Sequence, residues 1–200
     1  MVDKNKMSKG VLFGVLGVSC LVIVIISLAA VLYFNAPKKV KKEQLEGGNV
    51  YLTYSDDICG LDISGFTALT DDEGQKLNRA DMYFDFSVAS ELDEANEILY
   101  EIAVTPEKKT TVPLKNIKVY LEKQSSGTYV PVGEPMVISV SKEKSNLGSP
   151  ENSMIIHKES KKKSITDNYR LRVWASKESG VTITDKDIIS LKVSVSGKAS

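Results

Sequence analysis

Residues 83–104 read YFDFSVASELDEANEILYEIAV, and in two runs of this stretch large apolar side chains recur at every second position. Successive side chains of a β-strand point to opposite faces of its sheet, so a period of two predicts strands with one face on a core and the other in water. The inward positions of the two runs are Phe84, Phe86 and Val88, then Ile98, Tyr100, Ile102 and Val104.

The same period recurs along the rest of the chain. Residues 117–122, 169–174 and 191–196 alternate in this way, and shorter candidate strands cover 50–54, 61–69, 129–132, 136–140 and 154–157. Turn-forming residues, such as Ser126-Gly127 and Ser179-Gly180, separate them. About ten short strands between turns predict a mainly β fold, an antiparallel jelly-roll-like β-sandwich, since a parallel sheet would need intervening helices.

One short helix and several loops interrupt the predicted strands. Thr70 and Glu73 have the spacing of a capping box, which predicts one or two helical turns within residues 70–77. The polar stretch 141–153 and the basic stretch 158–163 are expected to be long exposed loops.

An uncharged apolar segment precedes this β-rich region. Residues 11–34 read VLFGVLGVSCLVIVIISLAAVLYF, and as a helix they would span about 36 Å, against about 30 Å for the hydrocarbon core of a bilayer. We therefore expect a single transmembrane helix, which divides the chain into a basic segment (1–10), the helix (11–34), a juxtamembrane spacer (35–48) and a β-sandwich domain (49–200). The membrane-spanning residues include Val11, Leu12, Phe13, Leu21, Val22, Ile23, Ile25, Leu28, Leu32 and Phe34.

Two other interpretations of the apolar segment are considered. A secretory signal cleaved after Ser27-Leu28-Ala29 would release the domain, although the run is longer than the usual apolar region of such signals. A lipid-modified Cys20 is less well supported. Gly17 occupies the position three residues before this cysteine, where a leucine is expected. We expect the helix to be retained as a signal anchor.

The charges around the segment bear on sidedness and on partners. Lysines flank it on both sides, so the positive-inside rule nearly cancels, and the short basic leader favours a cytoplasmic N-terminus with the domain outside the cell membrane. Residues 1–42 hold seven lysines and one aspartate, which leaves 19 basic and 25 acidic residues in the remainder. This acidic balance argues against nucleic acid as a partner.

The domain is poor in residues that carry catalysis. His157 is the one histidine, Cys59 is the one cysteine after residue 20, and no zinc-protease, serine-hydrolase, Walker or paired-cysteine motif is present. No internal disulfide is possible, and burial is the expected state of Cys59. A Cys59–His157 dyad has no support in the spacing. We expect no enzyme activity, no catalytic residue and no cofactor.

Carboxylates gather in several predicted loops. Hard oxygen ligands of this kind could hold calcium, but no stretch matches an EF-hand loop, so solvated loop charge and a helix cap are the preferred interpretation. No metal site is expected. The residues concerned are Asp56, Asp57, Asp62, Asp71, Asp72, Glu73, Asp185 and Asp187.

One predicted strand carries the candidate partner-contact residues. Arg170, Arg172 and Trp174 fall on one face of residues 169–174, opposite Leu171 and Val173. An exposed tryptophan beside two guanidinium groups suits contact with a protein or a glycan. The alternative is that a loop covers this face, or that arginine packs over the tryptophan internally.

The order of several short motifs resembles that of the TasA and camelysin group of bacterial surface proteins. The motifs are the apolar segment ending at Tyr33-Phe34, LTDDEG (69–74), FDFSV (84–88), LYEI (99–102), IKVYL (117–121), YRLRVW (169–174) and KVSVSG (192–197). The resemblance implies a jelly-roll sandwich displayed outside the cell, with subunits that assemble into matrix fibres in the better-known members. Those members are usually released from the membrane, whereas the apolar run here is long enough to stay.

Two functions from different classes follow. The first is a non-catalytic surface module for structure, adhesion or protein–protein interaction, whose partners are its own kind through strand addition, another surface protein or a cell-wall glycan. The second is a calcium- or zinc-binding membrane-tethered enzyme or sensor. The shortage of histidine and of paired catalytic residues favours the first.

Overall fold

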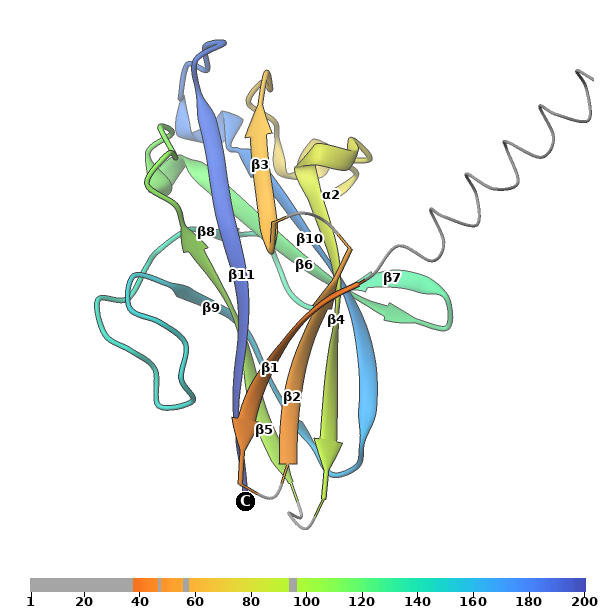
Figure 1. Ribbon diagram of the computed structural model, residues 1–200. Helices are drawn as coiled ribbons and strands as arrows, with labels where there is room; N and C mark the ends of the chain where they lie inside the picture. Colours follow the sequence, from red (N-terminus) through yellow and green to blue (C-terminus); the bar gives the residue numbers. More distant parts are fainter. Residues whose placement is uncertain (1–37, 47, 56–57, 94–96) are drawn as a thin grey trace, which may run out of the picture. The chain divides into compact units, whose positions relative to one another are not determined.

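The computed structural model describes residues 38–46, 48–55, 58–93 and 97–200 (Figure 1). These belong to one compact unit, Lys38–Ser200. The basic segment 1–10 and the predicted membrane helix 11–34 lie outside the described residues. Within the described ranges, no helix has the length and apolar character needed to cross a bilayer.

The described unit consists of two antiparallel sheets, so the predicted mainly β class is confirmed. The larger sheet has the order β1 (Lys39–Leu45), β2 (Gly48–Tyr54), β4 (Tyr83–Leu92), β10 (Ile165–Ala175), β6 (Ile117–Ser125) and β7 (Thr128–Pro131), and β8 (Met136–Val137) also pairs with β6. The smaller sheet has the order β3 (Gly60–Ser64), β11 (Ile188–Ala199), β5 (Ile98–Pro106) and β9 (Met154–Lys161). Among the described residues, helical structure is limited to α2 (Asp71–Gln75) and the 3₁₀ turns η1 (Ala80–Met82), η2 (Leu114–Asn116) and η3 (Lys177–Ser179).

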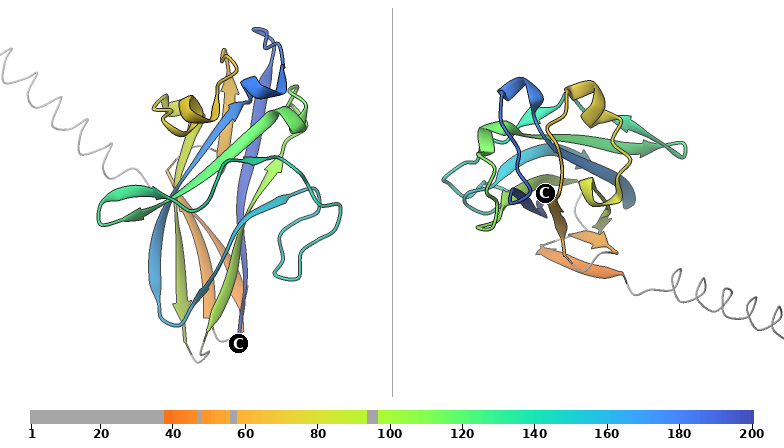
Figure 2. Two further views of the ribbon diagram at one scale, coloured as in Figure 1. Left: turned by 180° about the vertical axis from the view of Figure 1, so that it is seen from behind. Right: turned by 90° about the horizontal axis from the view of Figure 1, so that it is seen from above.

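One hydrophobic core lies between the two sheets, as the alternating pattern predicts. Along β4 every second residue from Phe84 to Ser90 is buried, and β2, β3, β5, β10 and β11 add their own inward residues to the same cluster. The rings of Phe84, Phe86 and Tyr169 stack with centroids 5.6 Å apart at each step. In Figure 1 β11 passes in front of β6, and in the left view of Figure 2 the order is reversed, because the strands belong to different layers.

The central strand β10 brings distant parts of the chain together. It pairs with β4 on one side and with β6 on the other, so that Arg170 lies opposite Asp85 and also opposite Glu122. Side chains that face away from the core on these three strands therefore form one continuous outer surface.

The predicted helix forms as α2 and closes one end of the sheet. Thr70 accepts a hydrogen bond from the Glu73 amide, and the Glu73 carboxylate accepts one from the Thr70 amide, so the capping box is present. Gly74 lies directly on the Trp174 ring, where a Cβ would come within 2.3 Å of the ring carbons. The helix therefore covers the end of β10 at a distance that only glycine allows.

Two predicted loops are partly strands. The expected spacer 35–48 contains β1, which pairs with β2 from Lys39–Tyr54 to Leu45–Gly48. The expected loop 158–163 begins as the end of β9, which pairs with β5 through Lys161. Both strands form edges of their sheets, and the charged side chains that made them look like loops are common on edge strands.

Candidate functional site

An aromatic and charged group, which we call the Arg170 group, lies on the outer face of the larger sheet and consists of Arg170, Asp85, Tyr83 and Tyr129. Arg170 Nε and Nη2 each donate a hydrogen bond of 2.7 Å to an oxygen of Asp85 on β4. Its guanidinium carbon lies 4.2 Å from the ring centroid of Tyr83 and 4.4 Å from that of Tyr129. The bidentate pair with Asp85 raises the pKa of Arg170, so the guanidinium stays charged between two rings.

A row of polar side chains crosses three neighbouring strands beside this group. The Ser87 hydroxyl donates to Asn168 Oδ1 over 2.7 Å, and Asn168 Nδ2 donates to Gln124 Oε1 over 2.9 Å. These bonds fix the orientation of the Asn168 amide. They leave that amide one further donor and one further acceptor site.

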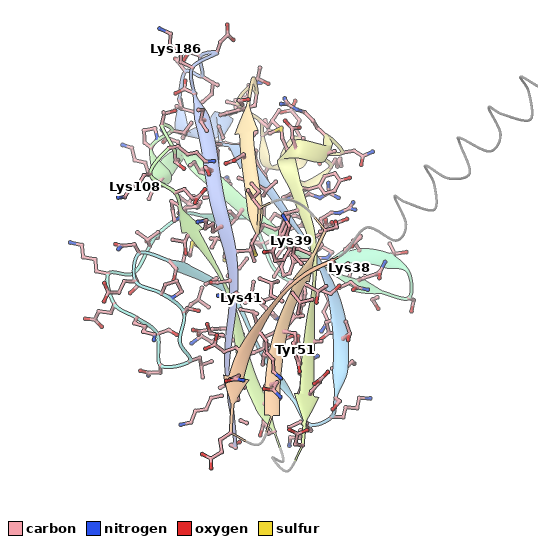
Figure 3. The ribbon with its side chains drawn as sticks, in the orientation of Figure 1. Lys38, Lys39, Lys41, Tyr51, Lys108 and Lys186 are labelled. Carbon is pink, nitrogen blue, oxygen red and sulfur yellow. The ribbon has the colours of Figure 1, made fainter. Side chains whose placement is uncertain are left out.

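A shallow hollow opens where β2 ends. The last residue pair between β2 and β4 is Tyr54–Phe86, and β4 extends beyond it to Tyr83. The space beside that extension is about 150 Å³, and we call it the β2-end hollow. Its lining comprises Lys38, Thr53, Tyr54, Ser55, Asp85, Phe86, Ser87, Tyr129 and Asn168. Figure 3 labels Lys38 at the beginning of β1.

Two of the three candidate contact residues are buried. Trp174 has no exposed surface, because α2 lies over its ring, and Arg172 is 8% exposed. Arg172 Nε donates to Glu122 over 2.7 Å, a buried ion pair within the sheet. The alternative interpretation, in which another segment covers this face, holds for the Trp174 end of β10. Only Arg170 of the three stays partly exposed.

A second polar group lies between the two sheets, at the side where β9 faces β6 and β10. We call it the Glu159 cluster. Glu159 Oε2 accepts hydrogen bonds from the hydroxyls of Tyr169 (2.7 Å) and Tyr100 (2.9 Å), and Lys161 bridges Glu159 Oε1 and Asp167 Oδ2 at 2.7 and 2.6 Å. Its members are Tyr100, Lys123, His157, Glu159, Lys161, Asp167 and Tyr169.

The hydrogen bonds and ion pairs of the Glu159 cluster stabilise the charged form of Glu159. Burial opposes ionisation of Glu159, but hydrogen bonds from Lys123, Lys161, Tyr169 and Tyr100 outweigh it, so the pKa of Glu159 lies well below its usual value. Burial and the neighbouring carboxylate raise the pKa of Tyr169. Lys123 and Lys161 thus face the carboxylates of Glu159 and Asp167, and these contacts join the two sheets.

Cys59 and His157 are not brought together. Cys59 precedes β3 and its thiol donates to the Val193 carbonyl oxygen, whereas His157 belongs to β9. β11 and β5 lie between β3 and β9, which at about 4.8 Å per strand separates the two side chains by well over 10 Å. His157 Nε2 lies 3.3 Å from Glu159.

The loop carboxylates take part in separate local interactions. Asp71 pairs with Lys118, Asp72 with Lys76, and Asp187 accepts hydrogen bonds from Thr184 and Thr111. Asp62 pairs with Lys109, while Asp56 and Asp57 lie outside the described residues. In the part of the chain that the structure describes, no three histidine, cysteine or carboxylate side chains lie close enough to hold a metal ion.

Sequence patterns did not identify the β2-end hollow. Thr53, Ser87 and Asn168 are ordinary outward residues of three alternating strands, and only the register places them side by side.

Comparison with known proteins gives no match: no protein-family model, curated protein or solved structure matches the chain.

Proposed function

We propose that this protein is a non-catalytic, membrane-anchored module that presents its β-rich domain outside the cell membrane and binds a partner there. In this proposal residues 11–34 are the retained anchor, the N-terminus is cytoplasmic, and the two sheets are a jelly-roll-like sandwich similar to the TasA and camelysin group. The apolar run, its basic leader and the motif order support these points.

The single observation that carries a binding role is the contrast between the two outer faces. On the smaller sheet, the loop 141–153 covers Glu101, whose carboxylate accepts hydrogen bonds from the Ser145 hydroxyl and the Ser149 amide, and Glu101 has no exposed surface. On the larger sheet, the Arg170 group and the β2-end hollow stay accessible. Arginine and tyrosine are enriched where proteins make their energetically important contacts.

The edge strands bear on the choice between face binding and strand addition. β1 exposes Lys41 and Lys42 along its length, and β9 directs His157, Glu159 and Lys161 towards the other sheet. Lysines and inward charges on edge strands hinder pairing with a second chain. We therefore place the contact on the outer face, with another surface protein, a cell-wall glycan or a second copy as its partner.

Sidedness and binding can be tested on the full chain. Protease added to intact cells is expected to remove the domain beyond residue 38, and protection until the cells are lysed would contradict the proposed orientation. Purified full chain in detergent should co-sediment with envelope material of its own cells, and Arg170→Ala should weaken this. Arg79→Ala is the matched control, since Arg79 bonds to Asp81 and to the carbonyl oxygens of Ser64 and Gly65 rather than to Arg170 or its partners. Equal sedimentation of both variants and the native chain would refute the proposed face.

A further inference from the structure

The β2-end hollow combines polar and aromatic side chains in its lining. Hydroxyl and amide groups come from Thr53, Ser55, Ser87 and Asn168, and aromatic side chains come from Tyr54, Phe86 and Tyr129. Neutral donors and acceptors beside aromatic side chains match a ligand that carries many hydroxyl groups on a ring.

The charges of the described lining residues are almost balanced. Asp85 is occupied by its bidentate pair with Arg170, and Lys38 is the one further charged residue among the described residues of the lining. By contrast, the surface depression at residues 105–109 and 192 is lined by three lysines and one glutamate. A strongly anionic or cationic ligand would therefore find no counter-charge cluster among the residues that the structure describes at the β2-end hollow.

The polar groups of the hollow are also held in place before any ligand binds. The chain Ser87–Asn168–Gln124 fixes the amide, and Arg170 fixes Tyr129 and Asp85 relative to each other. Because these side chains lose little freedom on binding, weak neutral hydrogen bonds can add up to a measurable affinity. The hollow has a volume of about 150 Å³ and opens to solvent, which leaves room for one sugar ring.

We infer that the β2-end hollow is a saccharide-binding site, in which one neutral or N-acetylated sugar ring stacks on Tyr129 and hydrogen-bonds to Asn168, Ser87 and Thr53. This inference rests on the proposed binding function and names the partner class of the same face. The remaining donor and acceptor of the Asn168 amide match two neighbouring hydroxyl groups of a pyranose ring.

The test uses the full chain in detergent, titrated with the tetramer of N-acetylglucosamine and with cellotetraose, and followed by saturation-transfer NMR and calorimetry. We expect one of these saccharides to bind. Asn168→Ala should weaken binding about fivefold to tenfold, the loss expected for one or two neutral hydrogen bonds. Tyr129→Ser should weaken it further, whereas Tyr129→Phe, which keeps the ring, should stay close to the native affinity.

The matched control is Asn146→Ala, in the loop over the other sheet. Melting temperature and elution volume of every variant verify that the fold is retained. Absence of binding by both saccharides, or equal loss in Asn146→Ala and Asn168→Ala, overturns the inference. The inference is also overturned if neither saccharide binds and an end-capped Thr-Val octapeptide, the probe for a peptide partner, does. If no saccharide binds but co-sedimentation with envelope material still depends on Arg170, the proposed function stands and the saccharide inference fails. If co-sedimentation does not depend on Arg170 either, the proposed function and the saccharide inference both fail.

Discussion

Burial controls the chemistry of Cys59 at the scale of a single residue. Its thiol donates a 3.1 Å hydrogen bond to the Val193 carbonyl oxygen, and burial raises its pKa from 9.0 to about 11. The thiolate is the reactive form, so a rise of two units lowers its fraction about a hundredfold at neutral pH.

We therefore predict slow alkylation of Cys59 in the folded chain. In a Cys20→Ser background, iodoacetamide at pH 8 should label the native protein about a hundredfold more slowly than the protein unfolded in guanidinium, as followed by mass spectrometry. The rate should rise about tenfold per pH unit up to pH 11, because the thiolate fraction does. Equal rates in the folded and unfolded chains would show that the thiol is accessible and unperturbed.

Alternation predicts which face of a strand a side chain lies on, but not whether that face is exposed, as Arg170, Arg172 and Trp174 show. Alternation correctly placed all three on one side of β10. It gave no information on whether another segment covers that side. α2 covers the Trp174 end and leaves Arg170 accessible, and this depends on a contact between residues about 100 positions apart.

At the scale of elements, α2 depends on a close approach to β10. A Cβ on Gly74 would come within 2.3 Å of the Trp174 ring, which is fully buried and has no room to move. Gly74→Ala should therefore destabilise the domain by about 1–3 kcal/mol, the usual cost of overpacking, and lower its melting temperature by several degrees.

Gly133→Ala provides the control for this substitution, because no atom lies within 4 Å of the added Cβ. Thermal unfolding of both variants, followed by circular dichroism, should show a decrease only for Gly74→Ala. A native melting temperature for Gly74→Ala would mean that α2 does not pack on Trp174 as described.

The edge strand β1 is expected to resist pairing with a second chain because of its lysines. Lys41→Thr removes a charge from an exposed edge position and adds a residue with high strand propensity, so dimers and larger species should increase. Lys186→Thr, in an exposed loop at the start of β11, should leave the distribution unchanged (Figure 3). Sizing chromatography with light scattering measures the outcome. Similar increases for both variants would indicate that net charge, rather than the edge, controls association.

At the scale of the whole unit, the Glu159 cluster joins the two sheets. Its hydrogen bonds and ion pairs lower the pKa of Glu159 below the ordinary glutamate value of about 4.3. A carboxylate with a lowered pKa contributes stability above its unfolded pKa and loses it as the pH falls towards the folded value. Glu159 therefore stabilises the fold at neutral pH and less so below about pH 4.

The Glu159→Gln variant tests this dependence. At pH 7 it should unfold with a free energy about 1–3 kcal/mol smaller than that of the native protein, since two lysines and two phenols lose a charged acceptor. The difference should narrow below pH 4, as measured by denaturant titration from pH 3 to 7. Glu151→Gln, at an exposed loop position, is the control. A difference that stays constant over this range would exclude a lowered pKa as the cause.

Some features of the fold were readable from the order of residues alone. The strands of nine or more residues were all predicted at least in part, because their side chains alternate between a buried and an exposed face, and the capping box was predicted, because Thr70 and Glu73 interact across one helical turn. The resemblance, the membrane anchor and the sidedness of the domain come from the sequence alone and remain predictions.

Tertiary structure decided the features that depend on register and on coverage. β1 and the end of β9 looked like charged loops, since an edge strand gains its hydrogen bonds from a neighbour that the local sequence does not reveal. The Glu159 cluster combines residues of both sheets, and the packing of one sheet on the other sets its distances. The β2-end hollow combines residues of β2, β4, β10 and β7, and the pairing of the strands in the larger sheet sets its distances. Periodicity reports which way a side chain points, and packing between distant segments determines what it meets there.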